Sequence, residues 1–212
     1  MIGNDVVDLC DRDADSATFS ARFDERVFAP SERSRIAMSA DPENCRWRMW
    51  SAKEAAYKAA RKADPTVLFS PKRFEVRFSE TDSPGAEICL GSTNPSRIEV
   101  QFFSEGSSVH AVALSPGWKH ARVVHGCERI STDSMGTSRS FGPGNAARRL
   151  ALQRLARALE FRRDQLEIRR EDRIPVLFES GRRVAGNLSL SHHGEWVAFA
   201  FECGVTTGEA AE

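Results

Sequence analysis

The feature that most constrains the fold of this chain is its hydrophobic pattern, which changes along the sequence from helical spacing to strand-like segments. Residues 49–61 carry Met49, Ala52, Ala56, Ala59 and Ala60 at helical spacing, and alanine has the highest helix propensity. This helix is followed by four segments with strand character, at residues 73–78, 87–90, 98–103 and 109–114. A second helix is expected from the N-cap Asn145 to Phe161, followed by strands near residues 165–169, 176–178, 188–190 and 196–201.

A helix followed by strands therefore occurs twice, which predicts an α+β fold. The two halves end alike, in VHAVAL at residues 109–114 and WVAFAF at residues 196–201, so the unit is interpreted as duplicated. Residues 2–9 form a further expected strand, and residues 19–38 suit one or two helices with a break at Pro30 and Ser31.

Domain boundaries follow from a polar segment without periodicity. Residues 131–144, STDSMGTSRSFGPG, are rich in Ser and Gly and are predicted to be a linker or mobile loop. This divides the chain into a first unit at 1–130 and a second at 145–204, with a tail at 205–212.

Composition excludes several classes of protein. Thirty cations balance thirty acids, and few aromatic residues lie among the arginines, which disfavours a nucleic-acid-binding domain. No stretch is long and apolar enough for a membrane helix or a signal peptide, so a cytoplasmic location is expected. The five cysteines are scattered without CxxC spacing, and Walker, Rossmann and G-x-S-x-G motifs are absent.

The charges are distributed unevenly along the chain. Residues 1–15 contain five aspartates and one arginine, whereas residues 143–183 contain eleven arginines and six acids. One end of the chain is therefore suited to a cation and the other to phosphates.

Two segments of the first unit combine charged and apolar residues. In GNDVVDL, residues 3–9, Asp5 and Asp8 lie within an apolar strand and point to opposite faces, so Asp5 is favoured as a metal ligand. Either carboxylate could instead cap a turn or pair with an arginine. In WSAKEAAYKAA, residues 50–60, Trp50, Glu54 and Lys58 form one ridge of the helix, and a solvated Glu-Lys pair is the alternative interpretation.

The third segment belongs to the second unit. In NLSLSHHGEWVAFAF, residues 187–201, the segment Ser191-His192-His193-Gly194 interrupts two apolar strands where a hairpin is expected to turn. These side chains either face a ligand or are ordinary hairpin residues.

Together, GNDVVDL, WSAKEAAYKA and LSLSHHGEWVAFAF resemble the signature blocks of the 4'-phosphopantetheinyl transferase superfamily. Residues 5–114 resemble the C-terminal half of the large surfactin-type members, and residues 148–201 resemble their N-terminal half, so the halves are in swapped order. Starting at the G-x-D strand is also the order of the small holo-acyl-carrier-protein synthases. The resemblance implies a pseudo-dimer of two helix-plus-antiparallel-sheet lobes with one internal site, and a monomer is the simplest expectation.

By motif position, the resemblance implies that Asp5 and Glu54 bind Mg2+ and that Lys58 lies near the transferred phosphate. Large members have an acid at the position of Val7, whereas Asp8 fits the spacing of the small synthases and is a possible third ligand.

The same resemblance implies which residues of the second unit contact coenzyme A. Ser191 and His192 match the pair that contacts its nucleotide end, and Arg148 or Arg149 is expected at its 3'-phosphate. Arg173 stands near the position of a lysine that the large members carry.

The implied reaction is transfer of phosphopantetheine from coenzyme A to a serine of an apo acyl or peptidyl carrier protein, with release of 3',5'-ADP. Glu54 would accept the serine proton and Lys58 would stabilise the leaving phosphate. The carrier would belong to fatty-acid, polyketide or nonribosomal-peptide synthesis. The alternative is a catalytically inactive module that binds coenzyme A or a carrier protein.

Overall fold

The computed structural model describes residues 1–15, 21–78, 85–90, 96–115, 121–130 and 142–204. These residues form helices and antiparallel sheets, which confirms the predicted α+β class. The predicted loop at 131–144 lies outside the described residues except for its last three positions, as does the predicted tail from 205.

The first unit is a five-stranded antiparallel sheet with order β1-β5-β4-β3-β2. Its strands are β1 (Ile2–Asp8), β2 (Phe74–Phe78), β3 (Gly85–Leu90), β4 (Ser96–Glu105) and β5 (Ser108–Leu114). Its helices are α1 (Ala21–Val27), α2 (Pro30–Met38) and α3 (Pro42–Ala63). The predicted helix over 49–61 is confirmed, and it begins earlier because Asp41 caps it by accepting from the Asn44 N–H at 3.0 Å.

The second unit contains helix α4 (Pro143–Ala158) and two three-stranded antiparallel sheets. One has the order β10-β11-β6, with β6 (Val123–Arg129), β10 (Gly186–His193) and β11 (Trp196–Cys203). The other has the order β7-β8-β9, with β7 (Leu166–Glu171), β8 (Ile174–Glu179) and β9 (Arg182–Arg183).

Two sequence expectations differ from the structure. The sequence analysis did not identify β6, whose alternation is interrupted by a central glycine, and it assigned these residues to the first unit although β6 pairs with β11. The N-cap of α4 is Gly142 rather than Asn145, because Pro143 occupies the first helical position, where its missing N–H costs nothing.

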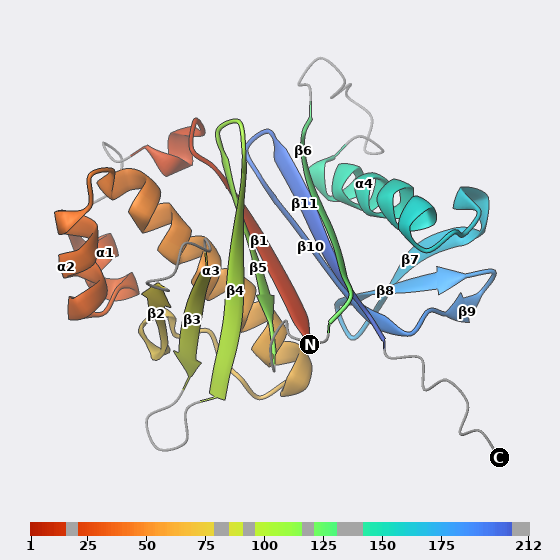
Figure 1. Cartoon of the computed structure of the whole chain (residues 1–212), viewed down its shortest axis with the longest axis horizontal. Helices are drawn as coiled ribbons and strands as arrows, with labels where there is room; N and C mark the ends of the chain where they lie inside the picture. Colours follow the sequence, from red (N-terminus) through yellow and green to blue (C-terminus); the bar gives the residue numbers. More distant parts are fainter. Residues whose placement is uncertain (16–20, 79–84, 91–95, 116–120, 131–141, 205–212) are drawn as a thin grey trace.

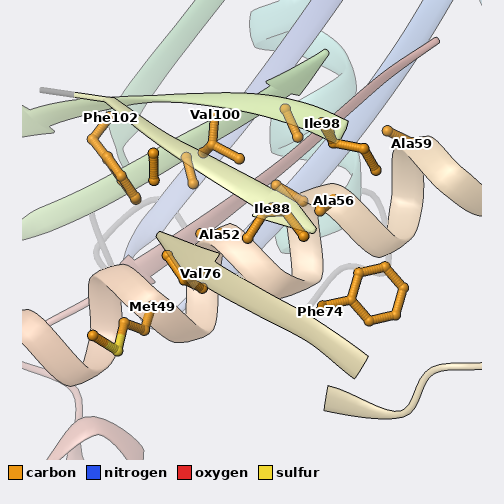
Figure 2. Packing of buried hydrophobic residues seen from close by; sticks show 14 of the residues in the cluster. Met49, Ala52, Ala56, Ala59, Phe74, Val76, Ile88, Ile98, Val100 and Phe102 are labelled. Carbon is orange, nitrogen blue, oxygen red and sulfur yellow. The ribbon is translucent and has the colours of Figure 1, made fainter. Parts of the chain in front are cut away.

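The molecule is layered as helix, sheet, sheet and helix (Figure 1). Ala52, Ala56 and Ala59 of α3 pack against Ile88 and the other apolar side chains on the face of the first sheet that α3 covers (Figure 2). A matching cluster joins α4 to the sheet of β6, β10 and β11. Smaller clusters between the two sheets join the units into one body.

Gly3 brings β1 unusually close to α3. A Cβ atom at this position would lie 2.0 Å from the Ala55 carbonyl oxygen, so only glycine fits. This contact places the two residues that follow Gly3 beside the middle of α3.

None of the helices in the described ranges is long and apolar enough to cross a membrane.

A buried ion pair fixes the outer side of α3. The Lys53 ammonium is fully buried, lies 2.7 Å from the Glu32 carboxylate of α2, and donates to the carbonyl oxygens of Pro71 and Phe74. Because every donor of Lys53 is engaged inside the protein, the pair fixes α3 relative to α2 and β2.

We predict that Lys53→Met lowers the free energy of unfolding by about 3–5 kcal/mol, because it leaves the Glu32 carboxylate buried without its cation. Urea denaturation measures this loss. Lys72→Met is the control, since Lys72 is exposed and its replacement should change stability by less than about 0.5 kcal/mol. Equal stability of the two variants would contradict the structural importance of the pair.

Candidate active site

Asp5 of β1 and Glu54 and Lys58 of α3 come together where the strand lies against the helix. The Lys58 ammonium lies 2.8 Å from an Asp5 carboxylate oxygen and donates to the Asn4 carbonyl oxygen at 3.0 Å. Glu54 is close enough for the charges of Asp5 and Lys58 to act on its pKa. The structure therefore brings together the three residues that the sequence predicted for one site, and Lys58 pairs with Asp5.

The Glu54 carboxyl has an altered proton affinity. Burial, and secondly the negative charge of Asp5, raise the pKa of Glu54 to about 7, although Lys58 acts in the opposite direction. Near neutral pH this carboxyl can therefore accept or release a proton, as an acid–base catalyst must.

A cationic cavity of about 360 Å³ opens beside Lys58. It lies between α3, the start of α4, the β7–β8 turn and β10. Its described lining contains six basic side chains and one acidic side chain, Asp172; the basic residues are Lys58, Arg61, Lys62, Arg148, Arg170 and Arg173. Such a cavity is suited to a ligand with several phosphate groups.

Two of the predicted arginines line this cavity and one does not. Arg148 is held at the start of α4 by donating to the Gly144 carbonyl oxygen at 3.1 Å, and it lines the cavity. Arg149 is exposed and is not among the lining residues. Arg173 is in the two-residue β7–β8 turn, where it and Asp172 have positive φ angles of 69° and 47°, as a tight hairpin requires.

The predicted pair on β10 is divided between two environments. Ser191 is 6% exposed, and its hydroxyl accepts from the Asn4 side-chain amide at 2.9 Å. Burial, and secondly the positive charge of Lys58, lower the pKa of His192. The cavity itself is lined by the neighbouring residues Ser189 and Leu190.

Asn4 and Lys62 contribute to the site although the sequence analysis did not identify them. Fully buried Asn4 donates to Ser189 from its backbone and to Ser191 from its side chain, which joins β1 to β10. Lys62 joins the same strands by donating to the carbonyl oxygens of Ile2 at 2.7 Å and Leu188 at 2.6 Å. Burial, with the nearby positive charge of Lys58, lowers the pKa of Lys62 to about 7.

Asp8 points away from these groups. It is 4% exposed, and its carboxylate accepts from Cys10 N–H, the Ser107 hydroxyl and Glu195 N–H at 3.0–3.2 Å. The Glu195 contact stabilises the β10–β11 turn, where Gly194 has φ +52° and a Cβ would lie 2.6 Å from Asp8. Asp8 therefore caps turns with its carboxylate, which was the alternative to metal binding in the sequence analysis.

The fold and the site thus define an α+β protein in which two units enclose a polycationic cavity beside a pair of carboxylates. The sequence model of the 4'-phosphopantetheinyl transferase superfamily matches residues 1–114, more than half of the chain. The chain therefore belongs to this superfamily and is a phosphopantetheinyl transferase. No curated protein sequence matches it.

Two solved structures are similar over parts of the chain. The holo-[acyl-carrier-protein] synthase of Neisseria meningitidis shares 21% identity, with a TM-score of 0.41, over 53% of this chain and 94% of its own. The holo-[acyl-carrier-protein] synthase of Thermotoga maritima shares 15% identity, with a TM-score of 0.40, over 86% of this chain and 83% of its own.

We predict that Asp5→Asn lowers the pKa of Glu54 in the metal-free protein, because it removes a neighbouring negative charge and releases Lys58 from its pairing. Carboxyl 13C NMR titration measures the shift, with the Glu54 resonance assigned by Glu54→Gln. The wild-type value should be about 7. Asp11→Asn is the control and should leave it unchanged; a Glu54 pKa that does not respond to Asp5→Asn would contradict the coupling.

Proposed function

We propose that this protein transfers 4'-phosphopantetheine from coenzyme A to a serine hydroxyl of an apo carrier protein and releases 3',5'-ADP. The observation that carries the proposal is the position of Lys58, which both pairs with Asp5 and lines the cationic cavity. A phosphate-rich ligand that contacts Lys58 in that cavity would therefore lie close to the carboxylates of Asp5 and Glu54.

In the proposed step, the serine oxygen forms a bond to the phosphorus that bears pantetheine, and the bond from that phosphorus to the leaving 3',5'-ADP breaks. Glu54 accepts the proton of the serine hydroxyl, directly or through a water molecule. Lys58 stabilises the negative charge that develops on the leaving phosphate.

Asp5 and Glu54 are suited to Mg2+, because the ion prefers oxygen ligands, keeps several waters and commonly uses one or two carboxylates together with substrate phosphates. Within the described ranges, no group of three or more His, Cys, Asp or Glu side chains is arranged to hold a metal. Two carboxylates with phosphate oxygens are therefore the proposed ligand set. Bound Mg2+ would neutralise charge on the diphosphate. Asp8 is left out of this set, because three donors already engage its carboxylate.

The cationic cavity is the proposed site for the nucleotide end of coenzyme A. Arg148 and Arg173 are positioned to pair with its phosphates, whereas Arg149 is exposed outside the lining. Ser191 contributes indirectly, because its hydroxyl accepts a hydrogen bond from the Asn4 side chain, and the charge of Lys58 acts on the imidazole of His192. Since both units contribute to one site, the proposed enzyme is a single-chain pseudo-dimer that acts as a monomer.

The transfer reaction is tested by intact-protein mass spectrometry of apo carrier proteins from fatty-acid, polyketide and peptide synthesis, incubated with coenzyme A and Mg2+. We expect a gain of one phosphopantetheine that EDTA abolishes. Glu54→Gln should lower turnover about 100-fold or more, because it removes the proton acceptor. Glu25→Gln, on an exposed part of α1, is the control and should retain activity.

Two outcomes would contradict the proposal. Retained turnover in Glu54→Gln would contradict the assignment of Glu54 as proton acceptor and metal ligand. Coenzyme A binding without transfer to any carrier would favour an inactive binding module, the second candidate, which the presence of Val7 at the position of a third acid supports.

Arg148 and Arg149 provide a matched pair for the nucleotide site. We predict that Arg148→Met raises the KM for coenzyme A about tenfold or more, because it removes a charge-assisted hydrogen bond to phosphate. The KM for 3'-dephospho-coenzyme A should change little if Arg148 contacts the 3'-phosphate. Arg149→Met should leave both KM values unchanged. Steady-state kinetics with both substrates measures these constants, and equal effects of the two variants would contradict the assignment of Arg148 to the nucleotide site.

A further inference from the structure

The six basic residues of the cationic cavity differ in how their hydrogen-bond donors are used. Four of them donate to backbone or side-chain oxygens of other described residues; these are Lys58, Arg61, Lys62 and Arg148. The other two, Arg170 and Arg173, are exposed and form no ion pair or hydrogen bond within the described ranges. Both belong to the β7–β8 hairpin, so this hairpin supplies the guanidinium groups whose donors are available to a ligand.

The strand register shows which face of the hairpin carries Arg170. Arg170 of β7 pairs directly with Pro175 of β8, and directly paired residues share one face of a sheet. Leu166 and Ile168, which alternate with Arg170 along β7, lie on the same face and belong to the apolar cluster that includes α4 and β10. Arg170 continues this face beyond the cluster, where both it and Pro175 line the cavity.

The adjacent residue Arg169 has a different environment. It lies on the opposite face of β7, forms an ion pair with Glu167, and places its guanidinium carbon 4.5 Å from the centre of the Phe178 ring. It is not among the residues that line the cavity. Of two neighbouring arginines on one strand, Arg169 is therefore bound within the hairpin, whereas Arg170 faces the cavity without a partner in the described ranges.

The acidic residue of the hairpin leaves its charge at the cavity positive. Asp172 is the one acidic residue in the described lining, and it lies in the turn between Arg170 and Arg173. Two arginines thus stand against a single aspartate. A guanidinium group remains charged at neutral pH, and its planar set of donors matches two oxygens of a phosphate group.

We propose that Arg170 is a further ligand-binding residue, which pairs with a phosphate group of the nucleotide in this cavity, together with Arg173 from the other side of the turn. This inference rests on the proposed use of the cavity for the nucleotide end of coenzyme A. Arg170 lies outside the three sequence blocks that resemble the superfamily, so its role follows from the register of the hairpin and the lining of the cavity.

Isothermal titration calorimetry of the full chain with 3',5'-ADP, 5'-AMP and 3'-AMP tests the inference, because it measures binding without a carrier protein or turnover. We expect Arg170→Met to weaken the binding of 3',5'-ADP about tenfold, the lower end of the range for a charge-assisted hydrogen bond, since the side chain is exposed. The monophosphate whose affinity also falls identifies whether the 3'- or the 5'-phosphate is bound.

Arg169→Met is the matched control. It removes the same charge one residue away, from the face that does not line the cavity, and should leave all three affinities unchanged. Thermal denaturation checks that Arg170→Met is folded; its midpoint should equal that of the wild type, because Arg170 has no partner to lose in the described part of the chain.

Three results would overturn the inference. Unchanged affinities in Arg170→Met would reject the role of Arg170 and leave the proposed nucleotide site in place. Equal weakening in Arg169→Met would show that only the net charge of the hairpin matters. Failure of the wild-type protein to bind any of the three nucleotides would reject the proposed nucleotide site and this inference together.

Discussion

The position of β1 is the constraint on which the rest of the structure depends. The strand lies against α3 on one side, where only glycine fits at position 3, and is hydrogen-bonded to β10 on the other through Asn4 and Lys62. Its backbone carbonyl groups thus accept from lysines of α3 while its own side chains reach the second unit. Asp5 lies in the middle of this contact, so both halves must be in place before the carboxylate and the cavity can face a common ligand.

The same contact concentrates polar groups in a region that apolar packing surrounds. Buried amide, hydroxyl and imidazole groups cost free energy unless they are paired, and here Asn4 pairs with Ser189, Ser191 and His110, although its Oδ1 and the Nδ1 of His110 have no partner among the described residues. The clusters of α3 and α4 with their sheets supply the compensating burial of apolar surface. The apolar clusters therefore surround a buried polar contact between β1 and β10, and Asn4 of this contact positions Lys58 by accepting its hydrogen bond.

The sequence predicted those features that depend on periodicity or on side-chain type. Helical period located α3 and the ridge that carries Glu54 and Lys58, whereas the resemblance to the superfamily motifs implied that Asp5 belongs to the same site. The sequence did not predict β6, since a glycine-containing strand has little pattern of its own and is stabilised by pairing with β11. Lys62 was missed because its acceptors are backbone carbonyl oxygens, which exist at every residue and leave no signal in a sequence.

The contact of Asp8 with the β10–β11 turn has a consequence for the order of folding. The Asp8 carboxylate accepts from Glu195, 187 positions later in the chain, and Asn4 donates to Ser191 over the same separation. During synthesis, β1 therefore leaves the ribosome long before its partners exist, and it must be kept from other strands meanwhile. Pairing with β5 shields one edge of β1 early, whereas the contacts of Asn4 and Asp8 with the second unit form only after the β10–β11 hairpin has been synthesised, so the candidate active site is completed late in folding.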